Sequence, residues 1–280
     1  MSSTENNNHP ITVITGGGGA LCGAIAEGLA RNGSYIVLLD IDEKAMHARV
    51  ESIETSGGRA SYYICDITNE KSVIDIEKTI TNEIGPPDHL INGAGGNDKR
   101  ATTDSEFLEV SDIESTSTQT LFDIDIDNFK RVFEINYHGT FIPSQVFSKG
   151  MARRGGGSIV NISSMAAFTP LTKVVAYSSA KAAVVNLTKW LSVHLSKVGI
   201  RVNSIAPGFF MTEQLRFMHV DQETGQYTPR AQKVVDHTPM QRYGNPDELL
   251  GAVKWLLSDE AGFVTGAVIP IDGGFSSFAI

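Results

Sequence analysis

Short apolar runs alternate with longer stretches of helical period from Ile11 to the end of the chain, and this alternation constrains the fold more than any other feature. It is typical of βαβ units, whose strands form a parallel sheet covered by helices on both faces. The predicted strands are residues 11–15, 35–40, 60–66, 89–92, 158–163, 201–206 and 268–271. The predicted helices are residues 21–32, 43–56, 70–84, 127–153, 174–198 and 246–258. We therefore expect one α/β domain over residues 11–280, with a doubly wound, seven-stranded parallel sheet.

Glycines support the predicted helix ends. A glycine follows each of four helices, where a left-handed residue commonly ends the helix; these are Gly33, Gly57, Gly85 and Gly199.

Composition excludes several classes of protein. The 23 Lys and Arg residues against 32 Asp and Glu residues give a net charge of −9, which argues against a nucleic-acid partner or an anionic membrane. Residues 1–10 are rich in Ser and Asn, so we expect a disordered tail and no signal peptide, and no apolar run is long enough to span a membrane. Cys22 and Cys65 stand alone, which predicts buried thiols in a cytoplasmic protein, with no disulfide framework and no metal site.

Two long stretches interrupt the alternation. Residues 97–125 are acidic and rich in Ser and Thr, and residues 209–245 form the second interruption. Both follow the carboxyl ends of predicted strands, where open α/β sheets bind ligands. Both are candidates for a substrate lid, and for the first a solvated surface insertion is an equal alternative.

A glycine-rich turn, Thr-Gly-Gly-Gly-Gly-Ala-Leu-Cys-Gly, lies between the first strand and the first helix. Glycines allow backbone N–H groups to approach a pyrophosphate at the positive end of a helix dipole, which a merely tight turn would not require. This predicts a Rossmann-like nucleotide site. The expected contacts are Thr15, Gly16, Gly17, Gly18, Gly19 and Leu21.

Carboxylates after the next two strands refine the cofactor. Asp40 ends the second strand, where it can accept hydrogen bonds from a ribose diol. Asp40 and Asp42 would repel a 2′-phosphate, and neither the turn nor residues 40–42 carry a cation, so we expect NAD(H) rather than NADP(H). Asp66 either contacts the adenine amino group or serves as the N-cap or turn residue before the helix that starts at Glu70.

Tyr177 and Lys181 lie one turn apart on a predicted helix. An ammonium beside a phenol lowers the pKa of the phenol from about 10, which suits Tyr177 to general acid/base catalysis. Ser164 follows the fifth strand, where its hydroxyl can orient a carbonyl. Asn136 is the remaining polar candidate.

These residues together resemble the short-chain dehydrogenase/reductase superfamily over residues 11–275. The turn at Thr15 and Gly16 is similar to its nucleotide turn, and Asn136, Ser164, Tyr177 and Lys181 fall at the positions of its catalytic tetrad. Three further segments are similar to superfamily motifs: Asn92-Gly93-Ala94-Gly95, Pro207-Gly208 with Thr212, and Asp272-Gly273-Gly274.

The resemblance implies a role for each of these residues. Tyr177 would donate and accept the proton, Lys181 would bind the nicotinamide ribose, Ser164 would hold the substrate oxygen and Asn136 would anchor a water relay. Hydride would pass between nicotinamide C4 and a secondary alcohol carbon. Further cofactor contacts would be Ile67, Asn92, Gly93, Ala94, Tyr177, Lys181, Pro207, Gly208 and Thr212.

Three positions depart from the superfamily pattern. Ala20 and Cys22 stand where later glycines are usual, and Gly93 replaces an Asn. All three replacements are small, so we expect cofactor binding to be kept.

Within the superfamily, residues 91–97 with 101–103, 168–173, 206–214 and 238–240 look like D-mannonate oxidoreductases, also called fructuronate reductases. The acidic stretch over residues 106–120 is similar too. This implies the reaction of D-mannonate and D-fructuronate. Alternatives are a gluconate 5-dehydrogenase, a polyol dehydrogenase, a 3-oxoacyl thioester reductase and a non-catalytic NAD-sensing module, although a sensor has no need of Ser164, Tyr177 and Lys181 together.

A sugar-acid substrate requires a cation for its carboxylate. The candidates are Arg100, Lys173, Arg216 and Arg242, of which Lys173 and Arg100 come closest to strand ends in the sequence. The helix over residues 174–198 carries apolar or small residues nearly all round, which predicts that a second face is buried against another subunit. By resemblance, the assembly would be a homotetramer.

Overall fold

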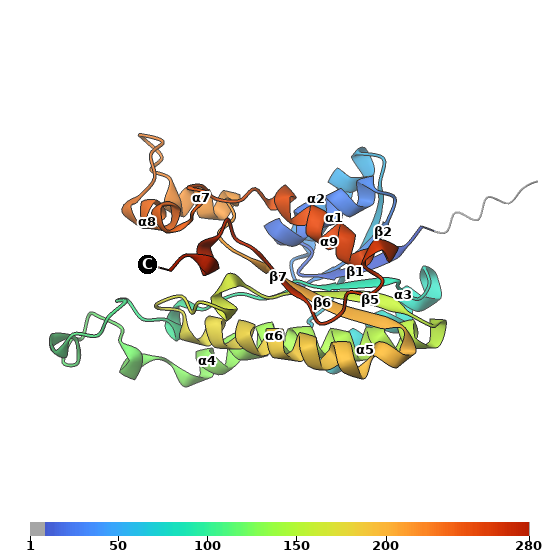
Figure 1. The fold of residues 1–280 in the computed structure, drawn as a ribbon, viewed down its shortest axis with the longest axis horizontal. Coiled ribbons are helices and arrows are strands. Elements are labelled where there is room, and N and C mark those ends of the chain that lie inside the picture. The colour runs from blue at the N-terminus through green and yellow to red at the C-terminus, as the bar shows by residue number, and fades with distance from the viewer. Residues whose placement is uncertain (1–8, 280) are drawn as a thin grey trace, which may run out of the picture.

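Seven parallel strands form one sheet in the computed structural model, which describes residues 9–279 (Figure 1). The order across the sheet is β3-β2-β1-β4-β5-β6-β7, so the chain reverses its direction of travel between β1 and β4, and the predicted doubly wound fold is confirmed. The strands are β1 (Ile11–Thr15), β2 (Tyr35–Asp40), β3 (Arg59–Ile64), β4 (His89–Asn92), β5 (Gly157–Ile162), β6 (Ile200–Pro207) and β7 (Val268–Ile271).

Helices cover both faces of the sheet (Figure 1). One face carries α1 (Ala20–Arg31), α2 (Glu43–Thr55) and α9 (Leu250–Leu257). The other carries α3 (Glu70–Glu83), α4 (Ile126–Phe133), α5 (Gly139–Arg154) and α6 (Val175–His194). No helix in the described range is long and apolar enough to cross a membrane.

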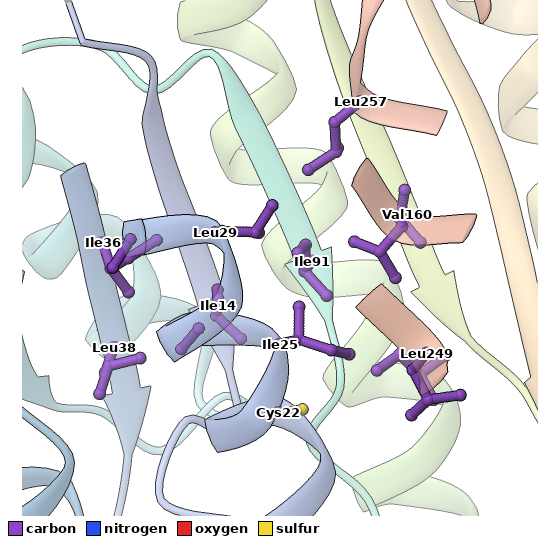
Figure 2. Packing of buried hydrophobic residues seen from close by; sticks show 14 of the residues in the cluster. Ile14, Cys22, Ile25, Leu29, Ile36, Leu38, Ile91, Val160, Leu249 and Leu257 are labelled. Carbon is purple, nitrogen blue, oxygen red and sulfur yellow. The ribbon is translucent and has the colours of Figure 1, made fainter. Parts of the chain in front are cut away.

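Alternate strand residues supply two hydrophobic cores. In β1, Val13 packs into the core under α3, α5 and α6, whereas Ile14 packs under α1 and α9. Figure 2 shows the second of these cores, where Ile25 and Leu29 of α1 lie above strand residues such as Ile91. Because both faces of inner strands such as β1 and β2 are buried, these strands read as mainly apolar runs in the sequence.

The helix ends agree with the predicted glycine positions. Gly33, Gly57, Gly85 and Gly199 all have positive φ, from 77° to 131°. The helix predicted over residues 127–153 is wrong as a single element, because a five-residue π-helical turn, Glu134–His138, separates α4 from α5. Gly139 follows that turn, and the side chain of Ile67 fills the space where a Cβ would lie.

The two long interruptions differ in structure. Residues 97–125 contain only short 3-10 turns, whereas residues 209–245 contain two helices that we had not predicted, α7 (Glu213–His219) and α8 (Pro229–His237). Their sequence signals were the N-caps Thr212 and Thr228 and a proline at the first position of α8. This segment has its own small core, formed by Ala231, Val235 and Tyr243.

The predicted N-terminal tail lies mostly outside the described residues, which begin at residue 9. Its last two residues belong to the domain. His9 Nδ1 lies 2.7 Å from the carbonyl oxygen of Gly33, and the N–H of Tyr35 donates to the carbonyl of Pro10.

Candidate active site

A cavity of about 750 Å³ opens at the carboxyl ends of the strands, at the switch point between β1 and β4. Both the predicted nucleotide end and the predicted chemical end of the site line it. The predicted site residues on its walls are Gly16, Gly19, Leu21, Asp40, Asp66, Ile67, Gly93, Ala94, Ser164, Tyr177, Lys181, Pro207 and Gly208.

The glycine-rich turn brings backbone close to the floor of this cavity. Gly16 has φ +69°, and a Cβ there would lie 2.7 Å from the Cα of Ala94. Its N–H donates to the carbonyl of Leu39 over 2.8 Å, and Gly19 is the N-cap of α1. The positive end of the α1 dipole therefore faces the cavity, as a pyrophosphate requires.

Three residues predicted to contact the cofactor have side chains that hydrogen-bond within the protein, and their contact with the cofactor stays a prediction. Thr15 Oγ1 accepts from the N–H groups of Gly93 and Ala94 over 3.1 and 3.2 Å. Asn92 is buried and donates through Nδ2 to Ser144 Oγ and Asn161 Oδ1, both over 2.8 Å. Thr212 accepts from the N–H of Leu215 as the N-cap of α7. Each side chain satisfies a nearby polar group, and none of the three residues is among those on the cavity wall.

Gly17 and Gly18 also lie behind the cavity wall. A Cβ on Gly17 would meet the side chain of Leu38, and the N–H of Gly18 donates to Asp40 Oδ2 over 3.1 Å. Asp40 Oδ1 accepts from the N–H groups of Ile41 and Asp42 over 2.7 and 3.2 Å. The Asp40 carboxylate is thus held in place on the cavity wall by three backbone donors.

Asp66 lies in a turn, because β3 ends at Ile64 and not at residue 66. Its Oδ1 accepts from the N–H of Thr68 over 3.0 Å and from the Thr68 hydroxyl over 2.7 Å. The N-cap of α3 is Asn69, so the N-cap alternative for Asp66 is wrong and the turn alternative is correct. Asp66 nevertheless remains on the wall of the cavity.

The chemical end is built by β5 and the start of α6. Ser164 follows β5 and begins a 3-10 turn, with its Oγ accepting from the N–H of Ala166 over 3.2 Å. Lys181 is 4% exposed and donates from Nζ to the carbonyl of Ile162 over 2.8 Å. Its Nζ lies 5.7 Å from the centroid of the Tyr177 ring. The structure thus brings Ser164, Tyr177 and Lys181 to one wall of the cavity.

Burial controls the ionisation of both titratable groups at this wall. It lowers the pKa of Lys181 to about 8, and it raises the pKa of Tyr177, against a smaller opposing effect of the Ser164 hydroxyl. We expected Lys181 to lower the pKa of Tyr177. That expectation is wrong for this structure, because burial raises the pKa of Tyr177 and the opposing effect comes from the Ser164 hydroxyl, not from Lys181.

Asn136 lies behind the cavity on the π-helical turn, a feature often found at functional sites. Its Nδ2 donates to the carbonyls of Gly96 and Val132, both over 2.7 Å, and its Oδ1 accepts from the N–H of Gly96 over 3.3 Å. A Cβ on Gly95 would meet Asn136 Oδ1 and, at 3.2 Å, Lys181 Nζ. Asn136 therefore fixes the turn after β4 directly beside Lys181.

None of the four predicted carboxylate-binding cations lines this cavity. Arg100 forms an exposed ion pair with Asp98 at 2.9 Å, and Arg242 is paired with both oxygens of Glu248 at 2.7 Å. Arg216 and Arg242 line a separate cavity next to α7. These positions follow from local ion pairing and from the two unpredicted helices.

Lys173 lies outside the cofactor cavity as well, but in a different place from the other three. It lines a second large cavity, formed by residues 169–174 and by α8. Sequence reasoning missed three basic residues on this cavity, which are Arg230, Lys233 and His237 of α8. Their spacing places them along one side of a helix, a signal that requires α8 to be recognised first.

Comparisons with known proteins agree with this architecture. The model of a family described as enoyl-(acyl carrier protein) reductase matches residues 19–276. An uncharacterised oxidoreductase of Haemophilus influenzae is 44% identical over 280 residues, covering 100% of this chain and 97% of the relative. The uncharacterised oxidoreductase UxuB of Bacillus subtilis is 42% identical over 276 residues, covering 98% of each protein.

A solved structure is similar over the same extent. It is the crystal structure, with bound NAD, of a proposed D-mannonate oxidoreductase from Haemophilus influenzae. It matches with a TM-score of 0.91 and 44% identity, covering 98% of both chains. With the family model matching nearly its whole length and the predicted fold confirmed, the chain belongs to this family within the short-chain dehydrogenase/reductase superfamily, and it is an oxidoreductase acting on alcohol and ketone groups.

Proposed function

We propose that the protein is an NAD-dependent dehydrogenase that interconverts D-mannonate and D-fructuronate. The observation that carries this proposal is the shared cavity, with Asp40 and the glycine-rich turn at one end and Ser164, Tyr177 and Lys181 at the other. The likeness to the NAD-bound structure of a proposed D-mannonate oxidoreductase supports both the cofactor and the substrate.

The cofactor is NAD, and the residues on the cavity wall fit it. Backbone at Gly16 and Gly19 meets the pyrophosphate, and the fixed carboxylate of Asp40 accepts hydrogen bonds from the adenosine ribose and disfavours a 2′-phosphate. Gly93, Ala94, Pro207 and Gly208 also line the cavity and would contact the cofactor. The bound cofactor supplies the hydride acceptor at nicotinamide C4.

The chain's own groups orient the substrate and move its proton. Ser164 Oγ holds the substrate oxygen, and Tyr177 Oη receives the proton from the alcohol or returns it to the ketone oxygen. Lys181, which is held by Ile162, binds the nicotinamide ribose and stabilises the phenolate when it forms. Asn136 acts as a positioning residue, because it fixes Gly95 and Gly96 beside Lys181.

The two long interruptions of the fold are the substrate lids of this enzyme. Residues 97–125 and residues 209–245 both contribute to the second cavity, through Glu106 on one side and α8 on the other. They belong to the single domain of residues 11–280, and they approach each other next to the start of α6.

The enzyme assembles as a homotetramer in the cytoplasm. Trp190 and Val193 on α6 are 55% and 77% exposed, which leaves an apolar helix face available for another subunit. Cys22 and Cys65 are both free and buried, in keeping with a reducing compartment.

A panel of oxidised substrates with NADH tests the proposed function. We expect D-fructuronate to be reduced with a higher kcat/KM than 5-keto-D-gluconate or an acetoacetyl thioester. Preference for 5-keto-D-gluconate or for the thioester would show that the proposed substrate is wrong, while the dehydrogenase activity would stand. NADH binding without turnover on any compound would support a sensor instead.

A further inference from the structure

The second cavity lies beside the proposed reacting groups. Its volume is about 750 Å³, and its walls are residues 169–174, α8, Phe209 and Phe275, with Glu106 from the acidic insertion. Val174 is the N-cap of α6, whose first turn carries Tyr177. Phe209 directly follows Gly208, which lines the cofactor cavity. Two segments thus lead from the reacting groups straight into this second cavity.

Three cations, Lys173, Arg230 and Lys233, lie around Glu106 in the second cavity, whose wall also carries Asp236. Lys233 Nζ contacts both oxygens of Glu106, at 2.7 and 2.6 Å. This hydrogen bond lowers the pKa of the Glu106 carboxyl, and the charges of Lys173 and Arg230 add to the effect. Arg230 forms no salt bridge with any residue from 9 to 279. The cations therefore already select a carboxylate, and one of them retains unused donors.

The acidic insertion is fastened over the cavity at the same point. Lys173 Nζ donates to the carbonyl of Asp104 over 2.6 Å, and the N–H of Thr103 donates to the carbonyl of Lys173 over 3.0 Å. Lys173 has φ +73°, a left-handed conformation that is unusual for a lysine and that occurs at ligand clamps. Glu106 lies two residues beyond Asp104, so these bonds hold its carboxylate among the three cations.

We propose that Lys173, Arg230 and Lys233 form the binding site for the substrate carboxylate, and that Glu106 occupies this site until the substrate displaces it. The proposal rests on the proposed function, because a sugar acid carries its carboxylate at the far end from the reacting ketone. It also explains why an acidic insertion and a basic helix meet at this place. The incoming carboxylate replaces Glu106 beside Lys233 and also reaches the donors of Arg230, and the released insertion is free to move.

Kinetic variants test the site. Arg230→Met should raise the KM for D-fructuronate by about 10-fold to 100-fold, since a charge-assisted contact is lost. D-Fructose, which has a hydroxymethyl group in place of the carboxylate, should show no such change. Glu106→Gln removes the competing carboxylate and should lower the KM for D-fructuronate. Arg153→Met, at the end of α5, is the matched control for loss of one positive charge, and Arg230→Lys should recover part of the affinity.

A binding measurement separates the site from the reaction. meso-Tartrate carries carboxylates on a hydroxylated chain, and erythritol, with the same stereochemistry, is its neutral counterpart. By calorimetry on the NADH-loaded protein, we expect tartrate to bind. Arg230→Met should raise its dissociation constant about 10-fold or more, and Glu106→Gln should lower it. Neither variant should change the binding of erythritol.

The outcomes distinguish the two proposals. If wild-type protein does not reduce D-fructuronate but tartrate binding depends on Arg230, the proposed substrate is wrong and the anion site stands. If D-fructuronate is reduced with a KM that is indifferent to Arg230→Met and Lys173→Met, the anion site is wrong and the function stands. If Glu106→Gln weakens tartrate as much as Arg230→Met does, Glu106 is part of the clamp and does not compete with the ligand.

Discussion

The sulfur of Cys22 occupies the space that a Cβ on Gly93 would need. Two of the three departures from the superfamily pattern therefore compensate each other in volume. Cys22 stands where a glycine is usual, and Gly93 stands at the facing position, where an Asn is usual. Figure 2 shows Cys22 near the start of α1, at the edge of the core. The turn after β4 is instead braced by Thr15, whose Oγ1 accepts from Gly93 and Ala94.

This compensation predicts that the two positions are coupled. Gly93→Asn alone should lower the melting temperature and weaken NADH binding, because its side chain collides with Cys22. The double variant Cys22→Gly, Gly93→Asn should recover most of both losses, which a double-mutant cycle with thermal unfolding and NADH titration would measure. A double variant no better than Gly93→Asn would refute the coupling.

Asp40 sets the cofactor preference. We expect wild-type kcat/KM to favour NADH over NADPH by at least about tenfold, or roughly 1.4 kcal/mol, because the carboxylate is fixed on the cavity wall. Asp40→Asn keeps the shape of the side chain and removes its charge, so it should reduce the ratio of kcat/KM with NADH to that with NADPH. Equal efficiency with both cofactors in the wild-type enzyme would remove this role from Asp40.

Tyr177→Phe should reduce turnover about 10²-fold or more, because it removes the hydroxyl that transfers the proton and changes the side-chain volume very little. Its NADH dissociation constant, from a fluorescence titration, should stay near the wild-type value. Tyr63→Phe, on β3 away from the cavity, is the control. Near-normal turnover of Tyr177→Phe across the pH range would show that another group transfers the proton.

Lys181 should make stability depend on pH in alkaline solution. Its pKa is about 8 in the folded protein and near 10.5 when exposed, so the unfolded chain binds the extra proton between these values. The free energy of unfolding should therefore rise from pH 8 to pH 10.5, by up to about 3 kcal/mol. Urea unfolding of wild type and Lys181→Met at several pH values would isolate this contribution. The same slope in both proteins would contradict it.

The exposed face of α6 predicts assembly. Light scattering at micromolar concentration should give a mass several times that of the 30.2 kDa chain. Trp190→Glu, which introduces a charge at a 55% exposed apolar position, should reduce the mass. A wild-type monomer would contradict the homotetramer.

The sheet was predictable because its signal is local. Most strands are short and mainly apolar, such as Ile11–Thr15, and glycines mark the helix ends. The nucleotide turn and the spacing of Tyr177 and Lys181 are equally local signals. Once the doubly wound sheet is predicted, both are expected at the carboxyl ends of its strands.

Features that depend on tertiary contacts were missed. The π-helical turn around Asn136 has helical sequence on both sides, and its bonds to Gly96 come from a distant part of the chain. Helices α7 and α8 are short and bury few residues, so their periodicity is weak. Glu106 and Lys233 form an ion pair between the two long interruptions. The spacing of residues within either interruption does not predict this contact.

The order of the strands has a consequence for synthesis on the ribosome. β1 pairs with β2 on one side and with β4 on the other, yet β3 and two helices are made before β4 emerges. Until then the nascent chain presents an apolar strand edge with unpaired N–H and C=O groups, the surface at which chains aggregate. When β4 is complete at Asn92 it pairs with that edge of β1, and the far edge of β4 then stays unpaired until β5 is made. We therefore expect the yield of native enzyme to depend on how fast residues 16–92 are synthesised and on whether chaperones can reach this part of the nascent chain.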